Sequence, residues 1–335
     1  MAKKKIGIIG AGRIGQLHAE NIIHNFNNVT IKSISDPYLD VQWANSVGIE
    51  HTYKDHTSIL NDTEIEAVLI CSPSHTHSKL IIEAANQGKD IFCEKPIDLD
   101  PNAIKQALSV VEKNKVKLQV GFNRRFDPNF VQIKQHIVKG EIGIPHIIKI
   151  TSRDPEPPNP DYIKDSGGMF LDMTVHDFDM ARFLAASEVT EVYARGAVLV
   201  DPKIGEQGDI DTAIITLSFA NGVIAVIDNS RKAAYGYDQR IEVFGSKGCT
   251  QAENNRQTNT TLLTEHRVQT DKPLFFFLER YKEAFKDEMG SFLKCLIDDL
   301  APSVTGHDGL MPVLIALAAN QSMKENRPVS LGEVG

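Results

Sequence analysis

The sequence predicts an α/β protein in which a doubly wound parallel sheet is followed by an α+β domain with a large, open-faced, mostly antiparallel sheet. Three observations support this prediction. The first 36 residues read as strand, glycine-rich turn, helix and strand, and strand and helix patterns then alternate as far as residue 122. Beyond about residue 145, longer strands follow one another without helices between them. We therefore expect one domain over residues 1–122 and a second over 123–335.

The first turn has the features of a phosphate-binding loop. An apolar, β-branched run at residues 5–9 predicts a buried strand, and the sequence GAGRIG at 10–15 follows it directly. Gly10 permits a tight turn, Gly12 lets the backbone approach a pyrophosphate, and Gly15 lets the next helix pack against the strand. The start of that helix offers unpaired N–H groups to phosphates. The alternative interpretation is a glycine turn that binds no ligand.

Asp36 indicates which dinucleotide this loop binds. It ends the second predicted strand, 21 residues after Gly15, where a carboxylate can accept hydrogen bonds from both hydroxyls of an adenosine ribose. The same carboxylate repels a 2′-phosphate, and no arginine occurs at residues 37–39. We therefore expect NAD rather than NADP.

The remaining elements of the first domain follow the same alternation. Helices are expected over 41–47, 57–60, 80–87 and 104–111, and strands over 51–53, 67–71, 90–93 and 117–121. In a parallel sheet of this kind, the ligand lies beyond the carboxyl ends of the strands. Most of the unusual polar residues of this half fall at those ends: Asp36, and the segments 72–77, 94–96 and 123–125.

In the second domain, the alternating pattern predicts strands over 146–151, 192–200, 213–219, 223–229, 240–244 and 261–264. Asn221-Gly222 predicts a hairpin turn. Two long amphipathic segments at 274–300 and 308–325 predict helices that pack back toward the first domain. The proline-rich segment 154–161 is either a stiff connector or a lid over a cleft.

Composition excludes several classes of partner. The net charge is −8 and the lysines and arginines are scattered, which argues against nucleic acid and anionic membranes as partners.

The cysteines at 71, 93, 249 and 295 have neither CxxC spacing nor histidines at zinc-ligand intervals, so we expect reduced thiols and no metal. The longest apolar run, 310–319, is too short to span a bilayer. We expect a cytoplasmic protein.

Lys95 is the first candidate for chemistry. It stands in Glu94-Lys95-Pro96, just past a buried strand, where an ammonium group can donate to a developing alkoxide. Pro96 fixes the turn, and a cis peptide bond is one way of doing so. The alternative is a solvated loop lysine without a catalytic role.

A second constellation lies within residues 167–180. On an α-helix, Asp172, His176 and Asp179 fall within about 60° of one another, in the middle of a stripe that should be apolar. Unpaired burial of such groups costs roughly several kcal/mol, so they must pair with each other or bind a polar ligand. A buried structural network is the alternative, and a metal site is weakly supported because no further histidine or cysteine stands nearby.

Together these residues supply what alcohol oxidation requires. A nicotinamide accepts a hydride from carbon, while His176, a base with a pKa near neutrality, takes the hydroxyl proton. Asp172 would orient that imidazole, and Lys95 would hold the oxygen. Four further side chains could hydrogen-bond the other hydroxyls of a polyol: Arg153, Asp154, Asp179 and Tyr235.

Over essentially its whole length the chain resembles the glucose-fructose oxidoreductase / inositol dehydrogenase family, also called Gfo/Idh/MocA. The resemblance rests on seven features: GAGRIG, Asp36, CSPSHTH at 71–77, CEKP at 93–96, GFNRRFD at 121–127, GGMFLDMTVHDFD at 167–179 and YGYD at 235–238. Within the family, the chain is most similar to bacterial NAD-dependent inositol 2-dehydrogenases. The resemblance implies an N-terminal Rossmann domain and oxidation of myo-inositol to 2-keto-myo-inositol (scyllo-inosose).

The resemblance also implies roles for individual residues. Lys95, Asp172 and His176 would form the catalytic set. The cofactor contacts would be Gly10, Gly12, Arg13, Ile14, Gly15, Asp36, Ser72, Ser74, His77, Glu94, Lys95 and Asn123. The substrate contacts would be Lys95, Arg125, Arg153, Asp154, Asp172, His176, Asp179 and Tyr235. The family usually forms homotetramers through the open sheet face.

Three classes of alternative remain at this stage. Ser152 and the proline-rich insert differ from some inositol enzymes, which leaves scyllo-inositol, chiro-inositol or a related sugar as other substrates. Some relatives are NAD-dependent glycosidases, which produce no net NADH. A non-catalytic NAD(H)-binding regulator is the remaining class, although such a protein could lose Lys95 or His176, and both are present.

Overall fold

The computed structural model describes residues 3–159, 162–163 and 166–334. The chain divides into two compact units. One consists of Met1–Phe126 with Glu283–Val313, and the other of Asp127–Lys282 with Leu314–Gly335. We expected the first domain to end at residue 122, with helices from 274–300 and 308–325 packed back on it; the first unit ends at Phe126 and also includes Glu283–Val313.

The first unit is built on a six-stranded parallel sheet with the strand order β3-β2-β1-β4-β5-β6. Its strands are β1 (Lys4–Ile9), β2 (Val29–Ser35), β3 (His51–Tyr53), β4 (Ala67–Ile70), β5 (Asp90–Glu94) and β6 (Leu118–Gly121). All four residues of β4 are fully buried, which accounts for its uninterrupted apolar sequence. The order reverses between β1 and β4, and this confirms the predicted doubly wound sheet.

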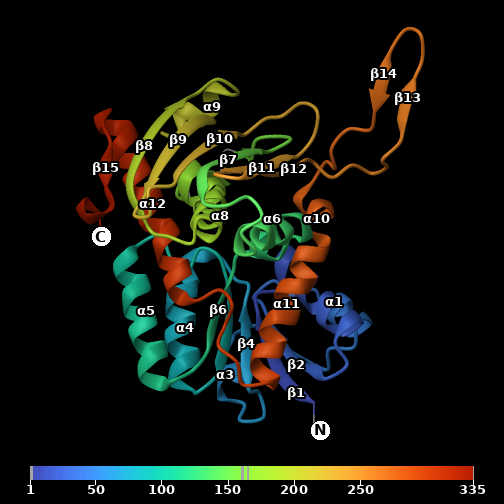
Figure 1. The fold of residues 1–335 in the computed structure, drawn as a ribbon. Coiled ribbons are helices and arrows are strands. Elements are labelled where there is room, and N and C mark those ends of the chain that lie inside the picture. The colour runs from blue at the N-terminus through green and yellow to red at the C-terminus, as the bar shows by residue number, and fades with distance from the viewer. Residues whose placement is uncertain (1–2, 160–161, 164–165, 335) are drawn as a thin grey trace. The chain divides into compact units, whose positions relative to one another are not determined.

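Helices pack on both faces of this sheet (Figure 1). They are α1 (Arg13–Asn25), α2 (Val41–Ser46), α3 (Thr57–Asn61), α4 (His77–Asn86), α5 (Pro101–Asn114) and α11 (Lys282–Ile297). Met289 and Phe292 of α11 share one apolar core with Ile22 of α1 and Phe92 of β5, so α11 packs on the same face as α1. Helices α4 and α5 lie together on the other face.

The second unit contains a seven-stranded sheet with the order β12-β11-β7-β10-β9-β8-β15. Its strands are β7 (Pro145–Arg153), β8 (Val189–Ala197), β9 (Thr212–Phe219), β10 (Ile224–Ser230), β11 (Asp238–Gly245), β12 (Gly248–Ala252) and β15 (Val329–Ser330). The pair β10–β7 is parallel and the other pairs are antiparallel, which confirms the mostly antiparallel sheet. We did not predict β12 or the two-residue strand β15.

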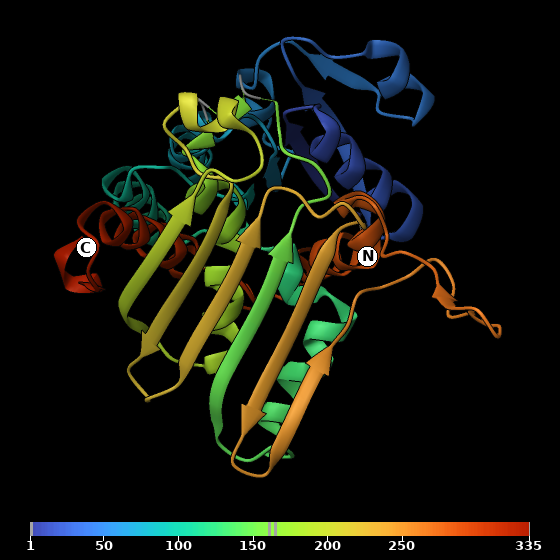
Figure 2. The same cartoon turned by 90° about the horizontal axis from the view of Figure 1, so that it is seen from above.

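One face of this sheet is covered and the other is open. Helices α6 (Pro128–Val138) and α8 (Val175–Ala185) pack on the face that carries Ile148 and Ile150, both of which are buried. Figure 2 looks onto the opposite face, over which no described helix lies. Buried and exposed side chains therefore alternate along β7 because α6 and α8 cover one face of the sheet only.

The remaining elements complete the chain. They are α9 (Pro202–Glu206), α10 (Phe277–Arg280), α12 (Gly306–Glu325), the hairpin strands β13 (Thr261–Leu263) and β14 (Val268–Thr270), and four short helical turns, η1 (Ser74–Thr76), η2 (Asn123–Phe126), η3 (Phe170–Thr174) and η4 (Leu331–Glu333). The predicted Asn221-Gly222 turn is confirmed: Gly222 has φ +87° and the Phe219 N–H donates to the Val223 carbonyl at 3.0 Å. The β13–β14 hairpin projects from the second unit (Figure 1).

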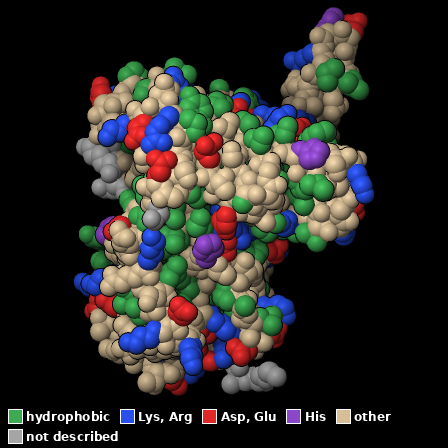
Figure 3. Space-filling view, turned by 60° about the vertical axis from the view of Figure 1, so that its left-hand side comes forward, with side chains coloured by type: hydrophobic (Ala, Val, Ile, Leu, Met, Phe, Trp, Pro, Cys, Tyr) green, Lys and Arg blue, Asp and Glu red, His purple; other side chains and the backbone are tan. Residues whose placement is uncertain are grey.

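The surface matches the scattered charge expected from the sequence. Lysine and arginine side chains are interspersed with aspartate and glutamate on the face drawn in Figure 3, without a large basic patch. Within the described part of the chain, every helix is too short or too polar to cross a bilayer. Asp154 to Asn159 of the proline-rich segment are described, whereas Pro160 and Asp161 lie outside the described residues.

Candidate active site

The first unit places the glycine-rich turn between β1 and α1. Gly10 has φ +100°, and a Cβ there would lie 2.5 Å from backbone atoms of Cys71 and Ser72. A Cβ at Gly15 would overlap the Gly10 carbonyl oxygen. Gly12 differs, because no described atom lies within 4 Å of a Cβ built on it. The fold itself therefore requires Gly10 and Gly15, whereas Gly12 leaves space for a ligand to approach the backbone.

This turn fits a dinucleotide. Gly12 is the N-cap of α1, and no described side chain caps the helix, so its first N–H groups can bind a phosphate. Asp36 lies across the turn, where its Oδ2 accepts from the Ala11 N–H and its Oδ1 accepts from the Tyr38 N–H, both at 2.8 Å. Each oxygen keeps a lone pair for a ribose hydroxyl. Arg13 is exposed and Ile14 half-buried on the first turn of α1.

The ends of β4 and β5 are tied together by His77. Its Nδ1 lies 2.8 Å from the Pro96 carbonyl oxygen and its Nε2 lies 2.7 Å from the Ser72 carbonyl oxygen. The side chain is 1% exposed, and burial lowers the pKa of its imidazole despite the two carbonyl oxygens. We expected His77 to contact the cofactor, but both ring nitrogens face the protein, so it supports the loops instead. The Lys95–Pro96 peptide bond is cis, as the sequence suggested.

The other predicted residues of this unit lie on the same rim. Ser72 and Ser74 are half-buried beyond β4, and the Ser72 hydroxyl lies 2.6 Å from that of Thr76. Lys95 is half-buried directly after β5. Asn123 is 4% exposed on η2.

Arg125, also on η2, binds Asp308 at 2.9 Å. Burial would raise the pKa of Asp308, but the charge of Arg125 and hydrogen bonds from Thr305 outweigh burial and lower this pKa to about 2. Arg125 therefore has a fixed carboxylate partner within the first unit.

In the second unit, the helix that carries Asp172 and His176 begins with an unusual turn. We expected one α-helix, but Phe170–Thr174 form a π-helical turn (η3) before α8 starts at Val175. Gly167 and Gly168 precede it, both with φ +82°. Asp209 accepts a hydrogen bond from the Met169 N–H at 3.0 Å and satisfies one of the first donors of this segment. Such π-turns are frequent at functional sites.

Asp172 is held by two side chains that the sequence did not single out. Arg231, just past β10, donates from a terminal guanidinium nitrogen to Asp172 Oδ2 at 2.9 Å, and the Tyr162 hydroxyl donates to Oδ1 at 2.9 Å. Arg231 also lies 3.7 Å from Asp154 and 3.9 Å from Asp209. Its side chain is 2% exposed. Burial alone would lower the pKa of Arg231, but the surrounding carboxylates raise it, so the cation is maintained.

A second buried network lies beside this one. Asn229 of β10 donates to Asp177 at 2.9 Å and to the Ser152 carbonyl at 3.2 Å, and it accepts from Thr174 at 2.6 Å. Asp177 is fully buried and Asp179 is 1% exposed on α8, whereas His176 is half-buried on the first turn of that helix. Residues 167–180 thus contain a structural network around Asp177, which the sequence did not single out, as well as the more accessible pair Asp172 and His176 of the predicted stripe.

Two predicted substrate residues are not brought to this place. Arg153 follows buried Ser152 on β7, and its guanidinium pairs with Asp228 on the opposite, open face of the sheet, at 3.0 Å from its Nε. The Tyr235 hydroxyl accepts from Arg153 at 3.1 Å and donates to Asp238. Because successive side chains of a strand point to opposite faces, the Arg153 side chain lies on the other face of the sheet from Ser152, and Tyr235 contacts it from the turn after β10; their substrate roles stay predictions. Asp154, in contrast, lies 3.7 Å from Arg231, close to Asp172 and Asp209.

Two family models match the chain. Residues 4–122 match the oxidoreductase family with an NAD-binding Rossmann fold, and residues 130–251 match the GFO/IDH/MocA C-terminal domain. The chain belongs to the Gfo/Idh/MocA oxidoreductase family. Its cofactor is accordingly NAD, which agrees with the open space at Gly12 and the position of Asp36.

Full-length relatives agree with this assignment. The chain is 53% identical to an uncharacterized oxidoreductase of Bacillus subtilis, over 97% of this chain and 96% of the relative. It is 47% identical to the myo-inositol 2-dehydrogenase of Thermotoga maritima, over 98% of this chain and 99% of the relative.

Solved structures share the fold. A probable dehydrogenase from Thermotoga maritima superimposes with a TM-score of 0.97 at 47% identity, over 99% of this chain and 100% of that chain. The scyllo-inositol dehydrogenase from Lactobacillus casei with bound NAD(H) and scyllo-inositol gives a TM-score of 0.91 at 30% identity, over 98% and 99% of the two chains.

Proposed function

We propose that this chain catalyses the NAD-dependent oxidation of a cyclic polyol, myo-inositol, to 2-keto-myo-inositol. The observation that carries the proposal is the fixed position of Asp172, which stands four residues before His176 in the chain. Buried Arg231 and Tyr162 both donate hydrogen bonds to its carboxylate. It is supported by the 47% identity to the myo-inositol 2-dehydrogenase of Thermotoga maritima.

Each catalytic residue has a distinct task in this proposal. The nicotinamide of NAD supplies the hydride acceptor. His176 takes the proton of the hydroxyl that is oxidised, and Asp172 orients the imidazole. The Lys95 ammonium donates to the same oxygen and stabilises the negative charge that develops as the proton leaves.

The remaining hydroxyls of the ring require fixed polar partners. We assign Asp154 and Asp179 to this task, together with Arg125, whose guanidinium is oriented by Asp308. The proposed cofactor contacts are Arg13, Ile14, Asp36, Ser72, Ser74, Glu94, Lys95 and Asn123. Arg125, Asp154 and Asp179 present both donors and acceptors, which suits a ring that carries a hydroxyl on every carbon.

A substrate panel tests the proposed function. The purified protein is given NAD with myo-inositol, scyllo-inositol, chiro-inositol or glucose, and NADH is followed by absorbance. We expect the largest kcat/KM with myo-inositol. A larger value with another polyol would move the assignment to that substrate, and glycoside cleavage without NADH formation would replace it with the glycosidase reaction.

We further propose that the protein is a homotetramer that associates through the open face of the seven-stranded sheet. Phe244, Ile147 and Ile224 lie side by side on β11, β7 and β10, and they are 47%, 38% and 51% exposed. Such an apolar row on an exposed sheet face is typical of an interface. Light scattering should give four chains per particle, and Ile147→Asp should reduce that number.

The cysteines support a cytoplasmic location for this proposed enzyme. Cys71, Cys93, Cys249 and Cys295 are all free thiols. Free thiols of this kind are characteristic of a reducing compartment.

A further inference from the structure

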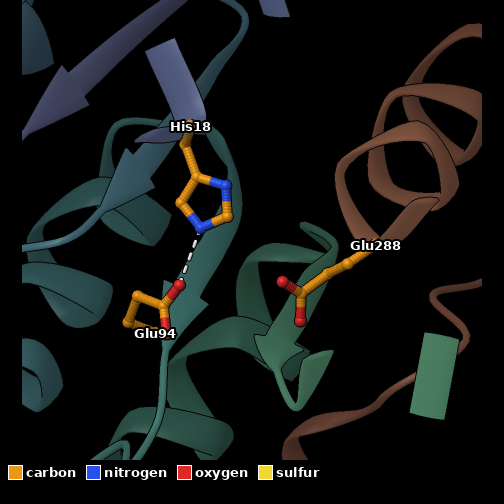
Figure 4. Close-up of side chains that lie close together, drawn as sticks. All are labelled: His18, Glu94 and Glu288. Carbon is orange, nitrogen blue, oxygen red and sulfur yellow. Dashed lines mark hydrogen bonds and ion pairs between the residues drawn. The ribbon is translucent and has the colours of Figure 1, made fainter. Parts of the chain in front are cut away.

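Three ionisable side chains of the first unit converge outside the proposed catalytic set. His18 comes from α1, Glu94 from the end of β5 and Glu288 from α11, and Figure 4 shows them pointing toward one another. Their polar atoms lie within 4.8 Å of one another. His18 and Glu288 are fully buried, and the side chain of Glu94 is 14% exposed.

The charges of this cluster do not balance if both glutamates are ionised. His18 Nε2 lies 2.7 Å from Glu94 Oε1, so the imidazole is already hydrogen-bonded to Glu94. Neither carboxyl oxygen of Glu288 has a hydrogen-bond donor among the described residues, and the Gln119 amide donates to the Glu288 backbone carbonyl instead. Two carboxylates cannot donate to each other, and burying an unpaired anion is costly. Something must therefore supply positive charge, either a proton or a cation.

The histidine favours the proton. A metal would need the lone pair of His18 Nε2, which faces Glu94 in a direct hydrogen bond. A histidine that binds metal also donates its other N–H to an acceptor. His18 Nδ1 has no such acceptor among the described residues, and the ring packs edge-on against Phe92 and Phe285. The His18 ring therefore makes one polar contact among the described residues, from Nε2 to Glu94, which does not fit the two contacts of a metal-binding histidine.

We propose that Glu288 is a neutral carboxylic acid whose proton gives it a donor toward Glu94, and that it thereby holds the Glu94–His18 pair immediately before Lys95. Glu288 is then a positioning residue for the oxidation, and this part of the inference rests on the proposed function. Glu94 ends β5 and Lys95 follows it in the chain, so a displacement of the Glu94 carboxylate is passed directly to the backbone of Lys95.

The electrostatic surroundings agree with this protonation state. Burial, and then the negative charge of Glu94, raise the pKa of Glu288 well above its usual value. Cys71, Cys93 and His77 also interact with the cluster. Burial raises the pKa of both thiols and lowers the pKa of the His77 imidazole, which favours the neutral form of all three. Ionisation of Glu288 in alkaline solution would place two carboxylates side by side and push Glu94 away.

Infrared spectroscopy tests the protonation state without reference to activity. Wild type should show the C=O stretch of a carboxylic acid at neutral pH, and this band should be missing in Glu288→Gln. Glu283→Gln, an exposed position on the same helix, is the control and should keep the band. If Glu288→Gln does not fold, the loss of the same band when wild type is titrated to alkaline pH provides the readout.

Kinetics test the positioning role. Glu288→Gln keeps a neutral group of the same shape, so kcat at neutral pH should stay within about twofold of wild type, while the alkaline decline of kcat should disappear. Glu288→Ala removes the donor and should lower kcat about tenfold with the KM for NAD unchanged. Absence of the acid band, or one equivalent of a divalent metal that is lost in Glu288→Gln, would overturn the proposal. An acid band in a protein that oxidises no polyol would instead refute the proposed function alone.

Discussion

Replacing Arg231 by methionine should show whether Arg231 supports catalysis or only stabilises the fold as one member of a buried ion pair. The guanidinium is 2% exposed, 2.9 Å from Asp172 and 3.7 Å from Asp154. Removing it leaves partly buried carboxylates without their cation, and breaking such a pair costs about 3–5 kcal/mol. Loss of the 2.9 Å contact also removes one of the two hydrogen bonds, from Arg231 and Tyr162, that fix the Asp172 carboxylate. Because small misplacements of catalytic groups cost about 10²-fold, kcat with myo-inositol should fall by about that factor.

The assay pairs denaturant unfolding with NADH formation. Arg182→Met is the matched control, since Arg182 is also buried and paired, with Glu188 at 2.6 Å and 2.8 Å, at the far end of α8. It should lose stability but keep kcat/KM within about twofold, since Arg182 stands in the last turn of α8 and binds Glu188 there. Arg231→Lys should fall between Arg231→Met and wild type because a lysine keeps the charge but not the planar guanidinium that lies near Asp172, Asp154 and Asp209. Wild-type turnover in a destabilised Arg231→Met would show that Arg231 serves the fold alone.

Three further predictions concern the first unit. Gly12→Ala should weaken NAD binding without lowering the melting temperature, whereas Gly10→Ala should lower both, because only Gly10 has backbone within 2.5 Å of a new Cβ. Equal decreases in the melting temperatures of the two variants, measured by calorimetry, would contradict this prediction. Asp36→Ala should raise the relative kcat/KM with NADP, and an unchanged NAD:NADP ratio would exclude the assigned role of Asp36. The Asp308 pKa is lowered from 3.8 to about 2, so its contribution is present above pH 3.8 and is lost as the pH falls toward 2. Asp308→Asn should therefore remove about 2 kcal/mol of acid-sensitive stability in denaturant unfolding at a series of pH values, and parallel stability curves would contradict this.

The parallel sheet and its glycine loop could be predicted because their determinants are local. Gly10, Gly12 and Gly15 occur within six residues, and Asp36 follows at a spacing set by one helix and one strand. Asp172 and His176 were also recognisable, because ionisable groups interrupt an apolar helical stripe. Such signals depend on the periodicity of a single element.

Residues that act from another part of the chain left weaker signals. Arg231 reaches Asp172 across 59 positions, and its only trace in the sequence is a polar run at the end of a strand. The face on which Arg153 lies could not be predicted, because strand parity near the end of β7 identifies a face only once it is known which face α6 and α8 cover. Glu288 could have been noticed, since it stands among Phe285, Met289 and Phe292 on one helix face.

The central claim is that Lys95 and His176 act on the same oxygen of the polyol in the same step, and a double-mutant cycle tests it most directly. The measurement is kcat/KM with myo-inositol for Lys95→Ala, His176→Ala and the double variant, with NAD affinity followed by fluorescence titration. Groups that act as one unit are strongly non-additive, so the double variant should be nearly as active as the weaker single variant. Losses that multiply, or full activity in either single variant, would contradict the account.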